Sequence, residues 1–181
     1  METITIQIFQ DDVYEEVAKA TDYTGSKLID GDDGARDRIL AADDDLAELS
    51  RFWEESVLAT NENLKEMLVS GKTKRITATL NPIYPVQGTT SEPATQAGIV
   101  IPVIGKIGYE AVIEVSKSFD KVLTASVQST LRSFFIASII GQWFKFANKG
   151  EAKDYFTQAA DMMETAERLL YSRRKPTRPT D

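Results

Sequence analysis

The chain has 181 residues, of which 42% are hydrophobic and 27% charged, a composition ordinary for a globular domain. It contains neither cysteine nor histidine. Disulfides, thiolate nucleophiles and cysteine-based zinc sites are therefore excluded, and the side chain best suited to proton transfer near neutral pH is missing. We expect a protein that is not an enzyme and that needs no cofactor.

Two features argue against a membrane protein. The first residues lack the basic and apolar regions of a secretory signal. The longest uncharged apolar run, between Arg132 and Lys145, has twelve residues, whereas a membrane span needs roughly 20. This run therefore predicts a helix buried in the subunit or a helix buried in an oligomer.

Charge is divided unevenly along the chain, whose net charge is −7. Residues 1–63 hold 17 acidic and 5 basic side chains, a balance of −12, and residues 64–181 hold 11 and 16, a balance of +5. A head-to-tail contact between identical subunits could use this asymmetry. Two solvated surfaces without a partner would explain it equally well.

The N-terminal half predicts a strand followed by helices. Alternating isoleucines predict a short strand or an extended arm over Thr3–Phe9. A first helix is expected over Val13–Asp22, capped by Asp11 or Asp12 and ended by Gly25. A long second helix is expected over 35–69, and because it would span roughly 50 Å, a break near 43–45 or 61–63 is plausible.

Two aspartate-rich stretches lie in this half, at Asp30–Gly34 and Asp43–Asp45. The first has Gly34 where a calcium loop needs an oxygen ligand, so a helix-capping turn is the better account. Three consecutive aspartates on a helix point about 100° apart and do not converge on one ion. We expect a solvated face and no metal.

The middle of the chain, 72–117, predicts an inserted β-ribbon with a long loop. Period-two patterns over 75–80 and 107–115 indicate two strands that could pair antiparallel. The loop between them, 82–104, holds four of the six prolines and ends in an apolar run. This run either packs on the subunit's own core or contacts another molecule, and its apolar members are Ile99, Val100, Ile101, Val103 and Ile104.

The C-terminal part predicts two apolar helices over 118–171, folded back through 148–150, with Trp53 and Trp143 in the subunit core. The chain closes with a basic, flexible tail over 173–181. The tail could touch an acidic neighbouring subunit, phosphate or nothing, and its cations are Arg173, Arg174, Lys175 and Arg178. The fold expected is mainly α: one domain, a bundle of about four helices with a long C-terminal hairpin and an inserted ribbon.

No catalytic spacing is recognisable. Gly105-Lys-Ile-Gly108 lacks the flanking residues of a nucleotide site, and serine–histidine catalysis is excluded. An enzyme that uses only carboxylates and lysine, with a magnesium ion, stays open because 28 acidic residues are available.

The order of elements resembles the head-to-tail connector, or adaptor, proteins of tailed bacteriophages. The resemblance rests on the Asp-rich turn before Arg36-Asp-Arg-Ile-Leu-Ala-Ala-Asp43 and on a terminal helix ending in Leu169-Leu-Tyr-Ser-Arg173. It covers most of the chain and is architectural. The ribbon and its loop are larger than in the simplest members of that family.

The resemblance implies a virion protein, assembled in the bacterial cytoplasm, that forms a homo-oligomeric ring. It implies contacts with the portal and with tail or stopper proteins, and passage of double-stranded DNA without sequence-specific binding. A sliding duplex requires an acidic or neutral channel, for which Asp43, Asp44 and Asp45 are candidates. The alternative is a cytosolic helical adaptor or regulator that binds a protein partner through its long loop.

Overall fold

The computed structural model describes residues 1–27, 40–41, 45–77 and 105–173, and it contains four α helices and three strands within them. The mainly α class, the C-terminal helical hairpin and the antiparallel ribbon are confirmed. In chain order the elements are β1 (Glu2–Phe9), α1 (Gln10–Lys27), α3 (Leu46–Asn63), β2 (Leu68–Ile76), β3 (Lys106–Val115), the 3-10 turn η2 (Lys121–Leu123), α4 (Thr124–Ala147) and α5 (Lys149–Leu170).

The strands form one antiparallel sheet in the order β1-β3-β2. The N-terminal segment is therefore a true strand and not a free arm, because Ile6 pairs with Ala111 and Ile8 with Tyr109. Ile4, Ile6 and Ile8 of β1 are buried, and the odd-numbered residues lie on the open face, as period-two alternation requires. The predicted ribbon of β2 and β3 is thus completed by a third strand from the start of the chain.

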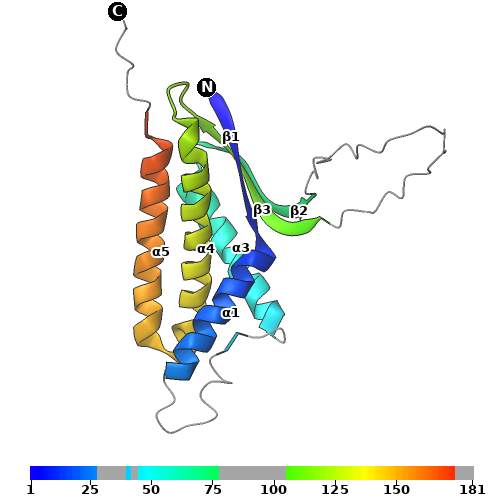
Figure 1. Cartoon of the computed structure of the whole chain (residues 1–181), viewed down its shortest axis with the longest axis vertical. Helices are drawn as coiled ribbons and strands as arrows, with labels where there is room; N and C mark the ends of the chain where they lie inside the picture. The colour runs from blue at the N-terminus through cyan, green and yellow to red at the C-terminus, as the bar shows by residue number, and fades with distance from the viewer. Residues whose placement is uncertain (28–39, 42–44, 78–104, 174–181) are drawn as a thin grey trace, which may run out of the picture.

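Helices α1, α3 and α4 contact the sheet, and α5 packs on α4 (Figure 1). An aromatic cluster lies where they meet: the Trp53 and Phe135 ring centroids are 4.8 Å apart, and those of Tyr109 and Phe135 are 5.4 Å apart. Trp53 is fully buried, and its indole N–H donates to Thr73 Oγ1 at 3.0 Å. The packing of these aromatic rings, together with the hydrogen bond of the Trp53 indole N–H, fixes the relative positions of α3, α4 and the sheet.

The hairpin of α4 and α5 is the largest packing unit (Figure 1). The predicted turn is only one residue long, since Asn148 alone separates the helices, and its side chain accepts from the Glu151 backbone N–H. As its apolar composition requires, α4 has several neighbours, namely α5, α1, α3 and β1. Trp143 was expected in the core but is only partly buried at its edge, whereas Trp53 is buried as expected.

Several element boundaries differ from the expected ones: β2 lies at Leu68–Ile76 and not at 75–80, whereas the second helix ends at the break expected near 61–63. The first helix runs through Gly25 to Lys27, since a helical glycine costs only about 1 kcal/mol and tertiary packing can offset it. The second helix begins at Leu46, in keeping with a break near Asp43–Asp45, and residues 40–41 are not helical. It ends at Asn63, because the fully buried Leu64 accepts from the Met67 and Leu68 N–H groups in a tight turn.

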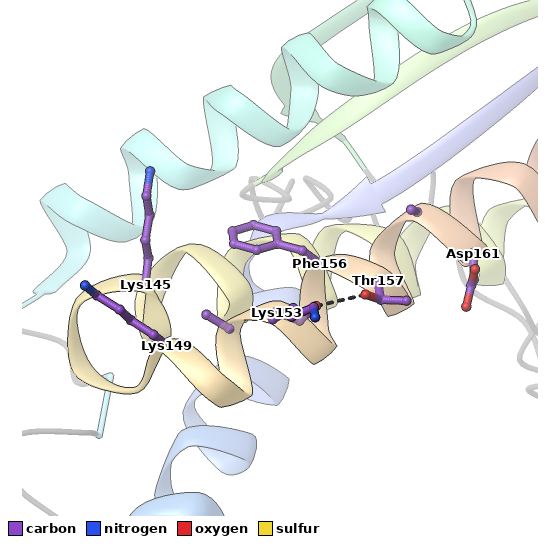
Figure 2. Close-up of a pocket in the computed structure, with 8 residues that line it drawn as sticks. Lys145, Lys149, Lys153, Phe156, Thr157 and Asp161 are labelled. Carbon is purple, nitrogen blue, oxygen red and sulfur yellow. Dashed lines mark hydrogen bonds between the residues drawn. The ribbon is translucent and has the colours of Figure 1, made fainter.

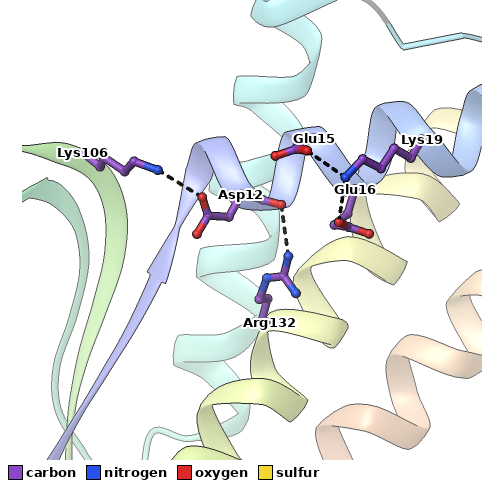
Figure 3. Close-up of polar contacts among 6 residues, drawn as sticks. All are labelled: Asp12, Glu15, Glu16, Lys19, Lys106 and Arg132. Carbon is purple, nitrogen blue, oxygen red and sulfur yellow. Dashed lines mark hydrogen bonds and ion pairs between the residues drawn. The ribbon is translucent and has the colours of Figure 1, made fainter.

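The start of α1 is tied to two other elements (Figure 3). Asp12 was expected as a possible helix cap, but it lies in the first turn, and its carboxylate pairs with Lys106 of β3 at 3.2 Å. Its backbone carbonyl accepts from Arg132 Nη2 of α4 at 3.3 Å. These contacts hold the β1–α1 corner against both the sheet and the hairpin.

One helical stretch in the described part of the chain, Lys121–Lys145, is long and apolar enough to cross a membrane by length and composition alone. The core helix of a soluble protein passes the same test, and 44% of the most apolar window is buried inside this protein. The contacts of α4 with three other helices and β1 account for its apolar character.

Candidate interaction surfaces

Only two of the residues proposed from the sequence as contacts or channel lining lie within the described part of the chain. Arg173 is exposed, and Asp45 is half-buried at the N-cap of α3. The others lie outside the described residues: Asp43, Asp44, Ile99, Val100, Ile101, Val103, Ile104, Arg174, Lys175 and Arg178.

Arg173 is placed at the end of the molecule where the sheet meets the hairpin. Its backbone forms an isolated antiparallel bridge with Phe119, which precedes α4. Beside it is a hollow of about 580 Å³ that also includes Met1, Glu114 and Tyr171. The lining mixes both charges with exposed apolar groups, so this hollow does not select one kind of ligand.

A second hollow, on the hairpin, is lined by cations on an apolar floor. We call it the basic groove: Lys145 of α4, with Lys149, Ala152, Lys153, Phe156, Thr157, Ala160 and Asp161 of α5 (Figure 2). Its volume is about 680 Å³. The ammonium groups of the three lysines have no ion-pair partner in the described part of the chain. With three lysines and one aspartate, Asp161, the lining has a net positive charge beside Phe156, which is 40% exposed.

Gly141 of α4 holds Phe156 in this position. A Cβ atom at Gly141 would lie 3.0 Å from two ring carbons of Phe156, closer than ordinary van der Waals contact allows. The absence of a side chain thus lets the ring rest on the α4 backbone while one side of it faces solvent. Figure 2 shows Lys145 and Phe156 extending from the hairpin toward α3.

The groove continues into a smaller hollow of about 380 Å³ between α3 and α5. Lys145 and Phe156 line both hollows, while Arg51 and Glu55 contribute from α3. Ser138 and Gln142 of α4 add polar groups between the two outer helices. The basic groove and the smaller hollow therefore form one continuous depression that runs from α3 to the turn of the hairpin.

The outer face of α3 has the opposite character. We call it the acidic ridge: Glu54, Glu55, Leu58 and Glu62. Leu58 is 66% exposed, and the three glutamates are four and three residues before it and four after it, which places them around it on one helical face. Glu55 and Glu62 have exposed ion-pair partners on the same helix or just after it, and Glu54 has none among the described side chains.

Three titrating groups with shifted pKa values lie outside the basic groove. Burial raises the pKa of Tyr14 to about 12 and also raises the pKa of Tyr109. The Lys74 ammonium, with a further hydrogen bond from Gln7, lowers the pKa of Glu110 on the open face of the sheet. These shifts arise from core packing and strand pairing, and none of the three groups lines the basic groove.

A metal site is not formed by the residues that the structure describes, because no three acidic side chains among them gather within reach of one ion. Asp43 and Asp44 lie outside those residues.

Sequence reasoning missed the groove and the ridge. A usable signal was present, since Lys145, Lys149 and Lys153 recur every four residues and Phe156 follows three residues later. The helix boundary at Asn148 hides this spacing, because it is uncertain from sequence whether a lysine before the turn shares a face with those after it.

The chain matches no protein-family model, no curated protein and no solved structure.

Proposed function

We propose that this protein is a structural subunit of a tailed-bacteriophage virion, a head-to-tail connector or adaptor that assembles as a ring. In this role it forms part of a conduit for double-stranded DNA, between the portal on one side and tail or stopper proteins on the other. It carries out no chemical step and binds no cofactor.

The observation that carries the proposal is the separation of charge between two surfaces of one subunit. The basic groove holds three lysines without ion-pair partners among the described residues, and the acidic ridge holds three glutamates around an exposed leucine. Surfaces of opposite sign on different helices suit a heterologous contact, which repeats from copy to copy and closes as a ring when the rotation allows.

The uneven charge of the sequence and the resemblance in element order support the same role. The long insertion between β2 and β3 leaves the sheet at the end of the ribbon, where it can reach a neighbouring protein without disturbing strand pairing. Its apolar members at 99–104 lie outside the described residues. We propose them, with the basic tail at 173–178, as contacts to neighbouring subunits, the portal or the tail.

The test is native mass spectrometry across a range of protein concentrations, followed by electron microscopy of the largest species. The proposal expects a closed ring with a central opening and one fixed number of subunits. Filaments without closure, or a species that stops at two copies, would contradict a conduit.

Deletion of residues 87–97 separates this proposal from its alternative. The strands pair through Ile76 and Lys106 at the near end of the insertion, so the shortened chain should still unfold cooperatively. A connector that uses the insertion should lose assembly. A wild-type chain that is monomeric throughout, and whose insertion captures a protein partner, would instead be the cytosolic adaptor or regulator.

A further inference from the structure

We propose that the acidic ridge of one copy docks in the basic groove of the next, with Leu58 seated against Phe156. This inference rests on the proposed function and names the subunit contact that such a ring would use. The occupant of the groove is thus a second copy of this chain.

The groove needs an occupant that is apolar at its centre and acidic at its border. Phe156 is 40% exposed, and its floor neighbours Ala152 and Ala160 are small, so a protruding aliphatic side chain can reach the ring. The lysines line the groove toward the hairpin turn and present ammonium groups that carry no internal ion pair. A small anion would satisfy the charge alone, without covering the ring.

The ridge offers the complementary arrangement. Leu58 is 66% exposed in the middle of α3, where an isolated aliphatic side chain gains nothing from the subunit's own core. The glutamates at 54, 55 and 62 surround it on the same face. When the ridge enters the groove, apolar contact forms at the centre and opposite charges meet at the rim, which is the usual anatomy of a specific interface.

The two surfaces belong to different helices, so the contact is heterologous. A copy whose ridge is docked still has its own groove free for another copy. The hollow that continues from the groove along α3 brings Arg51 and Glu55 to its edge, so the ridge and groove of one subunit are neighbours but do not fill each other.

The first experiment reverses charge on each side separately. One variant carries Lys149→Glu with Lys153→Glu, and the other carries Glu54→Lys with Glu62→Lys. All four side chains are exposed, so both variants should fold, as circular dichroism and thermal unfolding would verify. Each variant alone places like charges opposite each other and should associate at least about 100-fold more weakly than the wild type.

Mixing the two variants is the decisive test of the docking. In the mixture the acidic groove of one variant meets the basic ridge of the other, and the unmodified ridge of the first meets the unmodified groove of the second. Alternating assembly should therefore return to near wild-type strength. The matched control for the groove variant is Lys72→Glu with Lys117→Glu. It makes the same change in net charge as Lys149→Glu with Lys153→Glu, at exposed positions outside both surfaces, and should assemble normally.

Leu58→Ala tests the apolar part without changing charge. The side chain is exposed, so thermal stability should be unchanged, while association should weaken about tenfold because one buried aliphatic contact is lost. Raising the salt concentration from about 0.1 M to 1 M should weaken wild-type assembly. Neither charge-reversal variant should assemble more strongly than the wild type in high salt.

The outcomes distinguish the docking from the ring. Rings that survive both reversals would overturn the docking and leave the proposed function standing. Open filaments that are abolished by each reversal and restored by mixing would support the docking and overturn the ring. A wild-type chain that is monomeric at every concentration in low salt, or variants that fail to recover on mixing, would overturn the docking.

Discussion

The hydroxyl of Tyr109 in β3 donates a hydrogen bond to Asn61 Oδ1 of α3 at 2.8 Å, and the Asn61 amide group donates to the Gly71 carbonyl of β2 at 3.1 Å. One side chain therefore connects a helix to two strands. This arrangement needs Gly71, because a Cβ atom there would lie 2.2 Å from Asn61 Oδ1 and 2.7 Å from the Tyr109 hydroxyl.

Gly71→Ala should therefore destabilise the fold by about 1–3 kcal/mol, since the added methyl group displaces the Asn61 amide and breaks its hydrogen bonds. Urea unfolding followed by circular dichroism would measure this loss. Gly150→Ala is the matched control: it lies in the first turn of α5, where the nearest atom to a new Cβ is 3.6 Å away. It should keep or slightly raise stability, and equal losses in the two variants would contradict the steric account.

Stability should fall in alkaline solution because the buried Tyr109 and the partly buried Tyr14 resist ionisation. Burial raises the pKa of Tyr14 from 10.0 to about 12, and the pKa of Tyr109 is raised by the same cause. A raised native pKa means that the folded chain holds the proton more tightly, so this contribution is complete below pH 10 and is lost between pH 10 and 12. Unfolding free energies measured from pH 8 to 11 should show the decline.

Tyr14→Phe should make the alkaline decline shallower, because its side chain has no proton to lose. Tyr171→Phe changes an exposed tyrosine and is the control, whose profile should follow the wild type. If both variants retain the full decline, the loss belongs to other groups.

A smaller effect is expected in acid from the open face of the sheet. Lys74, and then Gln7, lower the pKa of Glu110 below its usual 4.5, with Lys74 Nζ at 2.5 Å from the carboxylate. This stabilisation is present above about pH 4.5 and is lost as the pH falls through the lowered native pKa. Glu110→Gln should cost about 0.5–1 kcal/mol at pH 7, given the exposure of the lysine, and less at pH 3. A cost that is the same at both pH values would contradict this assignment.

The buried hydroxyls of Ser56 and Ser138 join α3 to α4. Ser56 Oγ lies 2.9 Å from the Phe52 carbonyl and 3.0 Å from Ser138 Oγ. The single proton of the Ser56 hydroxyl thus has two acceptors, the Phe52 carbonyl and Ser138 Oγ. Ser56→Ala should cost about 1–3 kcal/mol because it leaves the second hydroxyl buried without this partner.

The double variant, with alanine at both positions, tests the pairing. Removing both hydroxyls leaves no unsatisfied partner, so its loss of stability should be smaller than the sum of the two single losses by about 0.5–1.5 kcal/mol. Additive losses would show that the two side chains act independently.

The sequence predicted those parts of the fold that depend on local periodicity. The apolar positions of α4, the stripe on α5 and the alternation in β3 each belong to one continuous segment, and each lies where it was expected. The strand character of Ile4, Ile6 and Ile8 was also visible, but the choice between a paired strand and a free arm depended on a distant partner in β3.

The errors lie where packing overrides a local signal. Gly25 looked like a helix end, and the apolar repeat through Leu64 and Met67 looked helical to its last residue. Burial of Leu64 and the contact of Asn61 with Gly71 instead require the chain to turn there and enter β2. The groove and the ridge could not be predicted for a related reason, since their character depends on which side chains the bundle leaves uncovered.

During synthesis, β1 is made long before β3, the strand with which it pairs. Gln7 hydrogen-bonds to Glu110, 103 residues later, so β1 leaves the ribosome long before the central strand that covers it. Until then Ile4, Ile6 and Ile8 form an exposed edge of high β propensity, whereas the α4–α5 hairpin can form from local contacts as soon as it emerges. Folding should therefore be limited by sheet closure, and conditions that slow translation should favour aggregation through β1.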